Sequence, residues 1–243
     1  MRRLKIDSFN WGDASIATAV RSAVAFPKAV LLKHVFDSAA CAQVVKAVSE
    51  DAATPILKPL RGENTVSYAR NKWTTRFQEP RQLLIGRGAE GSVRGQARLD
   101  LEPCFQPEQM PPQLLGGHEL NVSDSAIFVT SEGLRTGLHS DERHGMLVHM
   151  SGRKNFVLIP PEDSDADPRT LRKLLQLRRT SGKHDRLYGE QSRNLALRKV
   201  RLLHGTLETG DALFIPQRWL HDIESVDSTI SISLRFGNWD DPN

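Results

Sequence analysis

The sequence predicts a mainly β protein, a sandwich or barrel of short strands with helices before it and one helical insertion within it. Three observations lead to this prediction. From residue 124 onward, short apolar segments alternate with turns that contain glycine. Before residue 50, two segments carry apolar residues at helical spacing. A strongly basic interval at 162–206 separates two groups of predicted strands.

Composition excludes several classes of protein. The chain has 243 residues, 39% of them hydrophobic, and a formal net charge of +4, which argues against disorder and suits a single domain. No stretch reaches the roughly 18 apolar residues of a membrane helix, and no apolar signal core follows the N-terminus. We therefore expect a cytoplasmic protein with no membrane partner. Cys41 and Cys104 lie far apart, which argues against a disulfide scaffold and a zinc finger.

The N-terminal part of the chain is expected to contain helices and a sheet extension. Apolar residues at helical spacing predict helices over 14–25 and 38–49. The apolar, β-branched run 29–36 between them predicts a strand. Residues 54–93 have no clear pattern, apart from a short strand expected at 82–85.

The whole chain is expected to be one domain, in which 1–123 flank a core at 124–238. The core strands are predicted from short apolar runs bounded by Gly, Pro, Asp or Ser. They are 125–131, 136–141, 144–150, 153–161, 211–216, 220–226 and 228–236.

The insertion predicted at 162–206 carries the positive charge of the chain. Residues 169–201 contain eleven basic and two acidic side chains, so this segment has an excess of nine positive charges and the remainder is at −5. Asp167 begins a predicted helix whose exposed side includes Arg172, Arg178 and Arg179. This surface is either a solvated helix face or a cationic rim that attracts an anionic partner.

The motif with the clearest chemistry is His139-Ser140-Asp141. Residues two apart on a strand point to the same side, so the imidazole and the carboxylate would project together. His221, near the start of the later strand predicted at 220–226, offers a second imidazole. Two imidazoles and one carboxylate on one face of an octahedral metal leave three positions open, as in non-haem Fe(II) oxygenases. For any one of these residues alone, a polar turn without metal is the alternative.

The segments TGLHSDERHGMLVHMSGRKNFVLIPPED, GDALFIPQRWLHDIES and STISISLRFGN resemble the JmjC and cupin-like class of Fe(II) and 2-oxoglutarate-dependent oxygenases, especially its asparaginyl and peptide hydroxylase branch. The resemblance covers 124–238. It implies a double-stranded β-helix, or jelly roll, in which His139, Asp141 and His221 hold Fe(II). It also implies 2-oxoglutarate and O2 as co-substrates.

The resemblance assigns three further residues to co-substrate binding. Lys154, thirteen residues after Asp141, matches the lysine that binds the distal carboxylate of 2-oxoglutarate, and Thr136 matches a hydroxyl that bonds the same group. Arg235 departs from the branch's pattern, which often has Asn there. Its strand alternates an apolar face with a polar face that contains Arg235, and that polar face is either exposed to solvent or lines the reaction funnel. If it points inward, Arg235 could pair with a carboxylate of co-substrate or substrate.

These observations together predict a dioxygenase that hydroxylates a side chain of a peptide or protein. The alternative substrate is a free amino acid or a small anionic metabolite. Nucleic acid is less favoured as a partner of the basic segment, because Tyr188 is its single aromatic residue. A non-catalytic cupin-like binding module is the alternative of another class, and it has no need for the complete set of His139, Asp141, His221 and Lys154.

Overall fold

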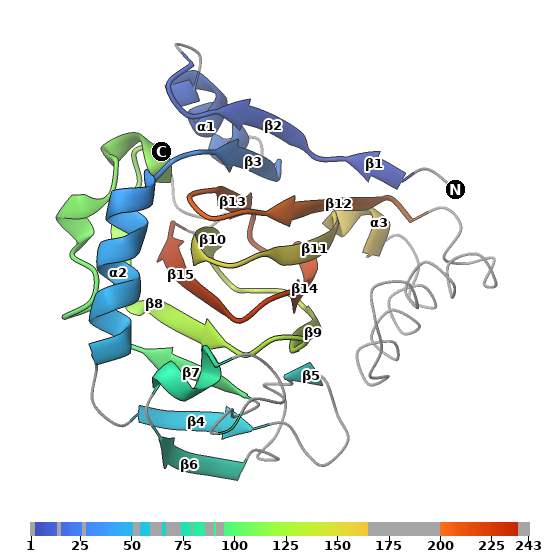
Figure 1. The fold of residues 1–243 in the computed structure, drawn as a ribbon. Coiled ribbons are helices and arrows are strands. Elements are labelled where there is room, and N and C mark those ends of the chain that lie inside the picture. The colour runs from blue at the N-terminus through green and yellow to red at the C-terminus, as the bar shows by residue number, and fades with distance from the viewer. Residues whose placement is uncertain are drawn as a thin grey trace.

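A computed structural model describes the chain at residues 3–13, 16–25, 28–50, 54–58, 65–66, 74–78, 80–85, 90, 95–164 and 200–237. The described residues form a six-stranded and a nine-stranded β-sheet (Figure 1). The predicted mainly β class with a jelly-roll core is confirmed. The predicted helix at Asp167 and most of the basic segment lie outside the described residues.

Strands β8 to β15 form the core as two four-stranded antiparallel layers. One layer has the order β12-β11-β14-β9 and the other has the order β13-β10-β15-β8. Successive strands alternate between the layers except β11 and β12, which are neighbours in one layer. The bounds are β8 Leu120–Thr130, β9 Arg135–His139, β10 His144–Ser151, β11 Lys154–Ile159, β12 Leu202–Leu207, β13 Ala212–Ile215, β14 Leu220–Ser225 and β15 Thr229–Phe236.

N-terminal strands extend both layers. In the larger sheet, β3 pairs with β13 and β2 with β3, while β7, β4 and β6 follow β8 at the opposite edge. In the smaller sheet, β1 pairs with β12 and β5 with β9. Their bounds are β1 Arg3–Lys5, β2 Asp7–Asn10, β3 Val30–Lys33, β4 Thr54–Lys58, β5 Thr65–Val66, β6 Thr74–Gln78 and β7 Gln96–Leu99.

Both N-terminal helices were predicted from their spacing. They are α1 (Ile16–Ala25) and α2 (Ser38–Glu50), and α2 begins where the Asp37 carboxylate accepts a hydrogen bond from the Ala40 N–H at 2.8 Å. Helix α2 lies against the outer side of the larger sheet (Figure 1), where Val44 and Val48 join its hydrophobic core. No helix of the described residues is long and apolar enough to span a membrane.

One face of strand β15 packs in the hydrophobic core beneath helix α2, and its other face lines the interior between the two layers. Ile230, Ile232, Leu234 and Phe236 are fully buried in the same cluster as helix α2, as the alternation predicts. The opposite side of the strand faces the other layer. Ser231 and Ser233 on that side are buried as well, so the polar face of β15 is interior and does not lie at the solvent surface.

Three sequence-based boundaries need correction. The strand expected at 82–85 is wrong, because η1 (Pro80–Leu83) is a 3-10 helix, and a three-residue apolar run has too few positions to distinguish periodicities. Strand β8 begins at Leu120, before the predicted 125. Strand β12 begins at Leu202, so the core resumes before the predicted insertion ends at 206. The remaining short helices are η2 (Pro107–Gln109), η3 (Pro112–Leu115) and α3 (Pro161–Ser164).

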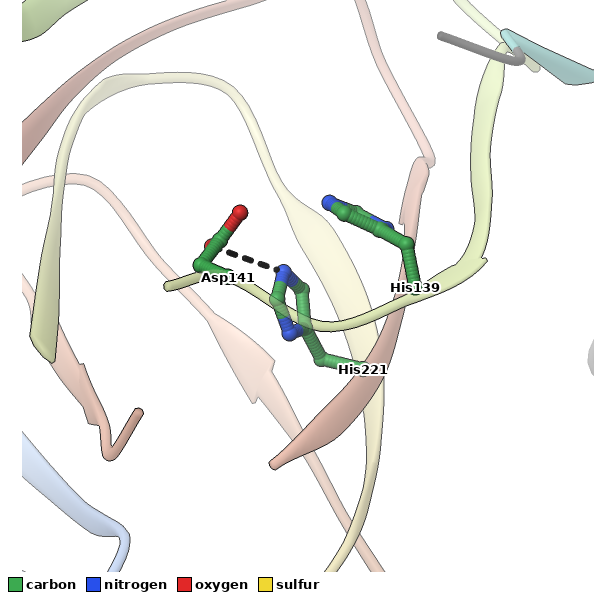
Figure 2. A group of neighbouring side chains, drawn as sticks. All are labelled: His139, Asp141 and His221. Atoms are coloured by element: carbon green, nitrogen blue, oxygen red, sulfur yellow. Dashed lines mark ion pairs between the residues drawn. The ribbon is translucent and has the colours of Figure 1, made fainter. Parts of the chain in front are cut away.

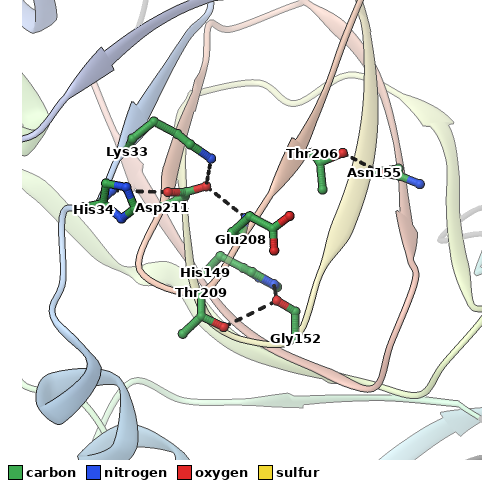
Figure 3. A network of polar contacts seen from close by, with 9 residues as sticks. All are labelled: Lys33, His34, His149, Gly152, Asn155, Thr206, Glu208, Thr209 and Asp211. Carbon is green, nitrogen blue, oxygen red and sulfur yellow. Dashed lines mark hydrogen bonds and ion pairs between the residues drawn. The ribbon is translucent and has the colours of Figure 1, made fainter.

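The Gly-Asp turn before β13 connects the N-terminal part to the core (Figure 3). The fully buried carboxylate of Asp211 forms an ion pair with Lys33 and accepts hydrogen bonds from the backbone N–H groups of His34 and Glu208. Gly210 has φ +89°, and a Cβ atom there would collide with the backbone of Phe36. The turn therefore requires both residues for packing and hydrogen bonding.

Asp211→Ala is expected to lower the free energy of unfolding by about 3 kcal/mol, because it leaves a lysine and two backbone donors without their acceptor. Urea unfolding measures this loss. The control is Asp7→Ala, which breaks an exposed ion pair with Lys28 and should cost less than about 1 kcal/mol. Equal losses in the two variants would contradict the role given to Asp211.

Candidate metal centre

The structure brings His139, Asp141 and His221 together at one end of the core (Figure 2). His139 is the last residue of β9, and His221 is the second residue of β14, directly opposite it in the register of the two strands. One potential ligand atom from each of the three residues lies within 4.8 Å of the others. The two imidazole rings have centroids 4.1 Å apart.

Asp141 reaches this cluster from a loop. The strand expected at 136–141 ends at His139, so two-residue alternation along a strand does not explain why the two side chains converge. The backbone of the loop is held instead by the Arg218 N–H, which donates to the Asp141 carbonyl at 3.1 Å. The turn before β14 thus positions Asp141 beside His221.

Both imidazoles are oriented by backbone carbonyls. The Nδ1–H of His139 donates to the Gly137 carbonyl at 2.7 Å, and the Nδ1–H of His221 donates to the Trp219 carbonyl at 3.0 Å. Because a carbonyl can only accept, the proton of each neutral ring lies on Nδ1 and the Nε2 lone pair is available. This is the arrangement that metal-ligating histidines use.

The cluster has the donor set that a metal ion needs. His221 Nε2 lies 3.3 Å from Asp141 Oδ2, and when the ring is neutral both atoms are hydrogen-bond acceptors. A proton or a metal ion is needed to hold two acceptors at this distance. Neighbouring ligands of an octahedral ion with bonds of about 2.1 Å lie about 3 Å apart. Asp141 Oδ2 is also buried without a hydrogen bond, which fits a ligand atom.

The electrostatics favour ligand protonation states. Burial, with a smaller contribution from His221, lowers the pKa of His139 to about 3, so this ring is neutral at pH 7. Burial alone would raise the pKa of Asp141, but the contact with His221 and the positive charge of Arg235 hold it well below its usual range. The site therefore presents a carboxylate and an unprotonated His139.

A cavity of about 450 Å³ opens from the cluster into the space between the two layers. Lys154, the first residue of β11, lines it and is 5% exposed. Burial lowers the pKa of Lys154 to about 7, and within the described chain no ion pair or hydrogen bond is recorded for its Nζ. An almost buried ammonium without an anionic partner is costly, so this group favours an anionic ligand in the cavity.

The strand register explains how Lys154 and Thr136 come to share this cavity. Leu158 pairs with His221 and Lys154 pairs with Ser225, so Lys154 faces the same side as His221, roughly 13 Å farther along the strands. Thr136 and His139 are three residues apart and would face opposite sides of a regular strand. An irregular register between His221 and Ile223 places both on the cavity side.

Arg235 points into the cavity. Its Nη1 lies 2.6 Å from Asp141 Oδ2, and its side chain is 19% exposed. The contact has the distance of an ion pair but not the angular geometry of a hydrogen bond. Of the two orientations left open for the polar face of β15, the structure has the inward one.

The cavity also contains residues that the motifs did not indicate. Gln96 on β7 is buried and lines it, together with Phe128 on β8. Gln96 comes from the sheet extension, where only a weak apolar alternation in the sequence marks β7. His149 on β10 is fully buried in the core, and its two ring nitrogens bond Ser231 Oγ and the Gly152 carbonyl. Arg172, Arg178 and Arg179 lie outside the described residues.

Residues 37–241 match the model of a cupin-like domain family. The chain belongs to this cupin-like family. Its relatives include human tRNA wybutosine-synthesizing protein 5, which is 28% identical over 45% of this chain and 33% of that protein. Bovine HSPB1-associated protein 1 is 32% identical over 46% of this chain and 24% of that protein. Lysine-specific demethylase JMJ31 of Arabidopsis thaliana is 28% identical over 47% of this chain and 21% of that protein.

The matches cover at most a third of the length of these three relatives. The predicted membership of a JmjC and cupin-like family is confirmed. At the level of the family, this cupin-like chain is related to JmjC-type oxygenases, and its His-Asp-His cluster is suited to bind a metal ion.

Proposed function

We propose that this protein is an Fe(II) and 2-oxoglutarate-dependent dioxygenase that hydroxylates a side chain of a peptide or protein. The observation that carries the proposal is the convergence of His139, Asp141 and His221, with both imidazoles oriented through Nδ1. The three residues would hold Fe(II) and leave three positions open. Fe(II) bound there, with 2-oxoglutarate and O2, would supply the oxidising chemistry of this enzyme class.

Lys154 and Thr136 are proposed to hold the distal carboxylate of 2-oxoglutarate. The ammonium of Lys154 would provide a charge-assisted hydrogen bond, and the Thr136 hydroxyl would provide a neutral one. Both face the cavity away from the metal cluster along β11 and β9. A ligand with carboxylates at its two ends could therefore contact the cluster and Lys154 at the same time.

The rest of the cavity would orient the ligand and exclude water. Leu147, Ile215 and Ile223 line it with apolar surface, which lowers the local dielectric and strengthens the interaction of Lys154 with an anion. The apolar lining also keeps the imidazole of His139 unprotonated.

A peptide or protein substrate is proposed because the sequence resembles that branch most and the insertion carries strong positive charge. The names of the relatives concern lysine demethylation and tRNA wybutosine synthesis, so substrate class varies among them. A free amino acid or a small anionic metabolite remains the alternative. A non-catalytic binding module would require neither iron-dependent turnover nor Lys154.

Intact-mass screening tests the proposal. Peptides and metabolites from the source organism, with anionic candidates first, are incubated with the protein, Fe(II), ascorbate and 2-oxoglutarate. A mass gain of one oxygen that depends on 2-oxoglutarate is expected in one peptide or protein. A gain found only in a small metabolite would support the alternative substrate. No succinate above a His139→Ala control would favour the binding module.

The basic segment supplies a separate prediction. Changing Arg172, Arg178 and Arg179 together to Glu should reduce turnover of the true substrate by at least about tenfold, because it reverses the charge that would attract an anionic partner. Succinate formed without substrate should stay the same. Exchanging the three residues for Lys is the control, since it keeps the charge. Unchanged substrate turnover in the Glu variant would mean that the segment is a solvated surface.

A further inference from the structure

Arg235 occupies the cavity because its neighbour on the next strand is a glycine. In the pairing of β10 with β15, Gly145 lies opposite Arg235, and a Cβ atom on Gly145 would overlap the guanidinium. The backbone N–H of Arg235 donates to Ser125 Oγ at 2.9 Å. The backbone is thus held in place, and the side chain extends toward Asp141 over the space that the glycine leaves open.

The guanidinium of Arg235 has more N–H donors than there are acceptors bonded to it. It carries five N–H groups in a planar fork that matches a carboxylate. Among the residues that the structure describes, its only ion pair joins Nη1 to Asp141 Oδ2, this pair lacks hydrogen-bond geometry, and the guanidinium has no other hydrogen bond. A mostly buried cation with unused donors in a cavity favours an anionic ligand.

The charge of the cavity also exceeds what the proposed co-substrate can match. The described lining contains two basic side chains, Lys154 and Arg235, and one carboxylate, Asp141, so with both basic groups protonated and both imidazoles neutral its net charge is +1. A divalent metal would raise this charge to +3, and a dicarboxylate would return it to +1. In that state, one more anionic group would bring the cavity to neutrality.

The location of Arg235 indicates which molecule provides that group. Lys154 lies roughly 13 Å along the strands from the metal cluster and would take one end of 2-oxoglutarate, while the metal would take the other. Arg235 contacts Asp141 at the metal end, where the group to be oxidised must lie. We infer that Arg235 binds a carboxylate of the primary substrate, which makes that substrate an acid. The inference rests on the proposed function.

The test follows the Arg235 side chain directly. The full chain is prepared with isotope-labelled arginine, loaded with Zn(II) and 2-oxoglutarate, and titrated with acetate while the arginine N–H signals are recorded by NMR. The Arg235 signal is identified by its loss in Arg235→Gln. Acetate should shift it to saturation, whereas acetamide, a neutral molecule of the same shape, should leave it in place.

Two results would overturn the inference. One is an Arg235 signal that ignores acetate or responds equally to acetamide. The other is evidence that the guanidinium binds the co-substrate instead. That evidence would be an acetate response of the Arg235 signal that 2-oxoglutarate abolishes, or a loss of more than about tenfold in 2-oxoglutarate affinity in Arg235→Gln. Failure of the proposed function is measured separately, by comparing Zn(II) binding of the unmodified protein with that of His139→Ala. It would appear as equal Zn(II) binding in the two proteins, whatever the effect of acetate on the Arg235 signal.

Discussion

His139→Ala is expected to reduce divalent metal affinity, and with it 2-oxoglutarate turnover, by more than about 100-fold. The imidazole supplies one of three converging ligand atoms, and its orientation through the Gly137 carbonyl gives Nε2 a free lone pair. Calorimetry with Co(II) measures the metal, and succinate formation measures turnover. Removal of the metal from the unmodified protein with a chelator should have the same effect on turnover and should be reversed by Fe(II).

The matched control is His34→Asn, which removes an exposed imidazole whose backbone has φ +59°, a conformation that Asn tolerates. This variant should keep metal binding and turnover. His139→Gln keeps a polar side chain of similar size, so a loss of metal affinity in this variant is not explained by misfolding. If His139→Ala is folded and binds Co(II) as tightly as the unmodified protein, the triad does not form the metal site.

Lys154→Met is expected to weaken 2-oxoglutarate binding by roughly 30- to 1000-fold, because the loss of a buried charge-assisted partner costs about 2–4 kcal/mol. Metal affinity should change little, since Lys154 lies four strand positions from the residue opposite His221. Thr136→Val, which removes a neutral hydroxyl of the same cavity, should have a smaller effect. An equal loss of metal and 2-oxoglutarate binding in Lys154→Met would contradict the assignment.

The same substitution is expected to stabilise the ligand-free protein. Burial lowers the pKa of Lys154 from its ordinary 10.5 to about 7, so between these values the unfolded chain binds more protons than the folded one. The stability of the unmodified protein should therefore rise with pH from about 7 to 10.5, and the cost of the buried charge is fully present below pH 7. Lys154→Met should lack that part of the rise and should have the higher melting temperature at pH 6.

Thermal unfolding at several pH values measures both effects. The control is Lys46→Met on the exposed side of α2, where the ammonium is in water and the same substitution removes no buried charge. Its difference from the unmodified protein should not change between pH 6 and pH 9. A Lys154→Met variant that is less stable than the unmodified protein at pH 6 would show that the ammonium has a structural partner.

The periodicity of single segments was sufficient for much of the fold. Ile16 and Val20 mark α1, and the alternation of Ile230, Ile232, Leu234 and Phe236 predicts their burial on one face of β15. Such patterns are readable because each residue of a helix or strand faces a direction set by its position along the element. The failure at 82–85 occurred where the apolar run was too short for a period, and β4 to β6 had no pattern that would separate them from loops.

The sequence by itself determined the mainly β class and the residue types of the candidate centre, His139, Asp141 and His221. Only the tertiary structure decided how they converge: Asp141 from a loop held by Arg218, Thr136 through an irregular register, and Arg235 through the space above Gly145. The reason is physical. Local periodicity depends on neighbours in the chain, whereas register, the interior side of a sheet and the space around a side chain depend on strands distant in sequence.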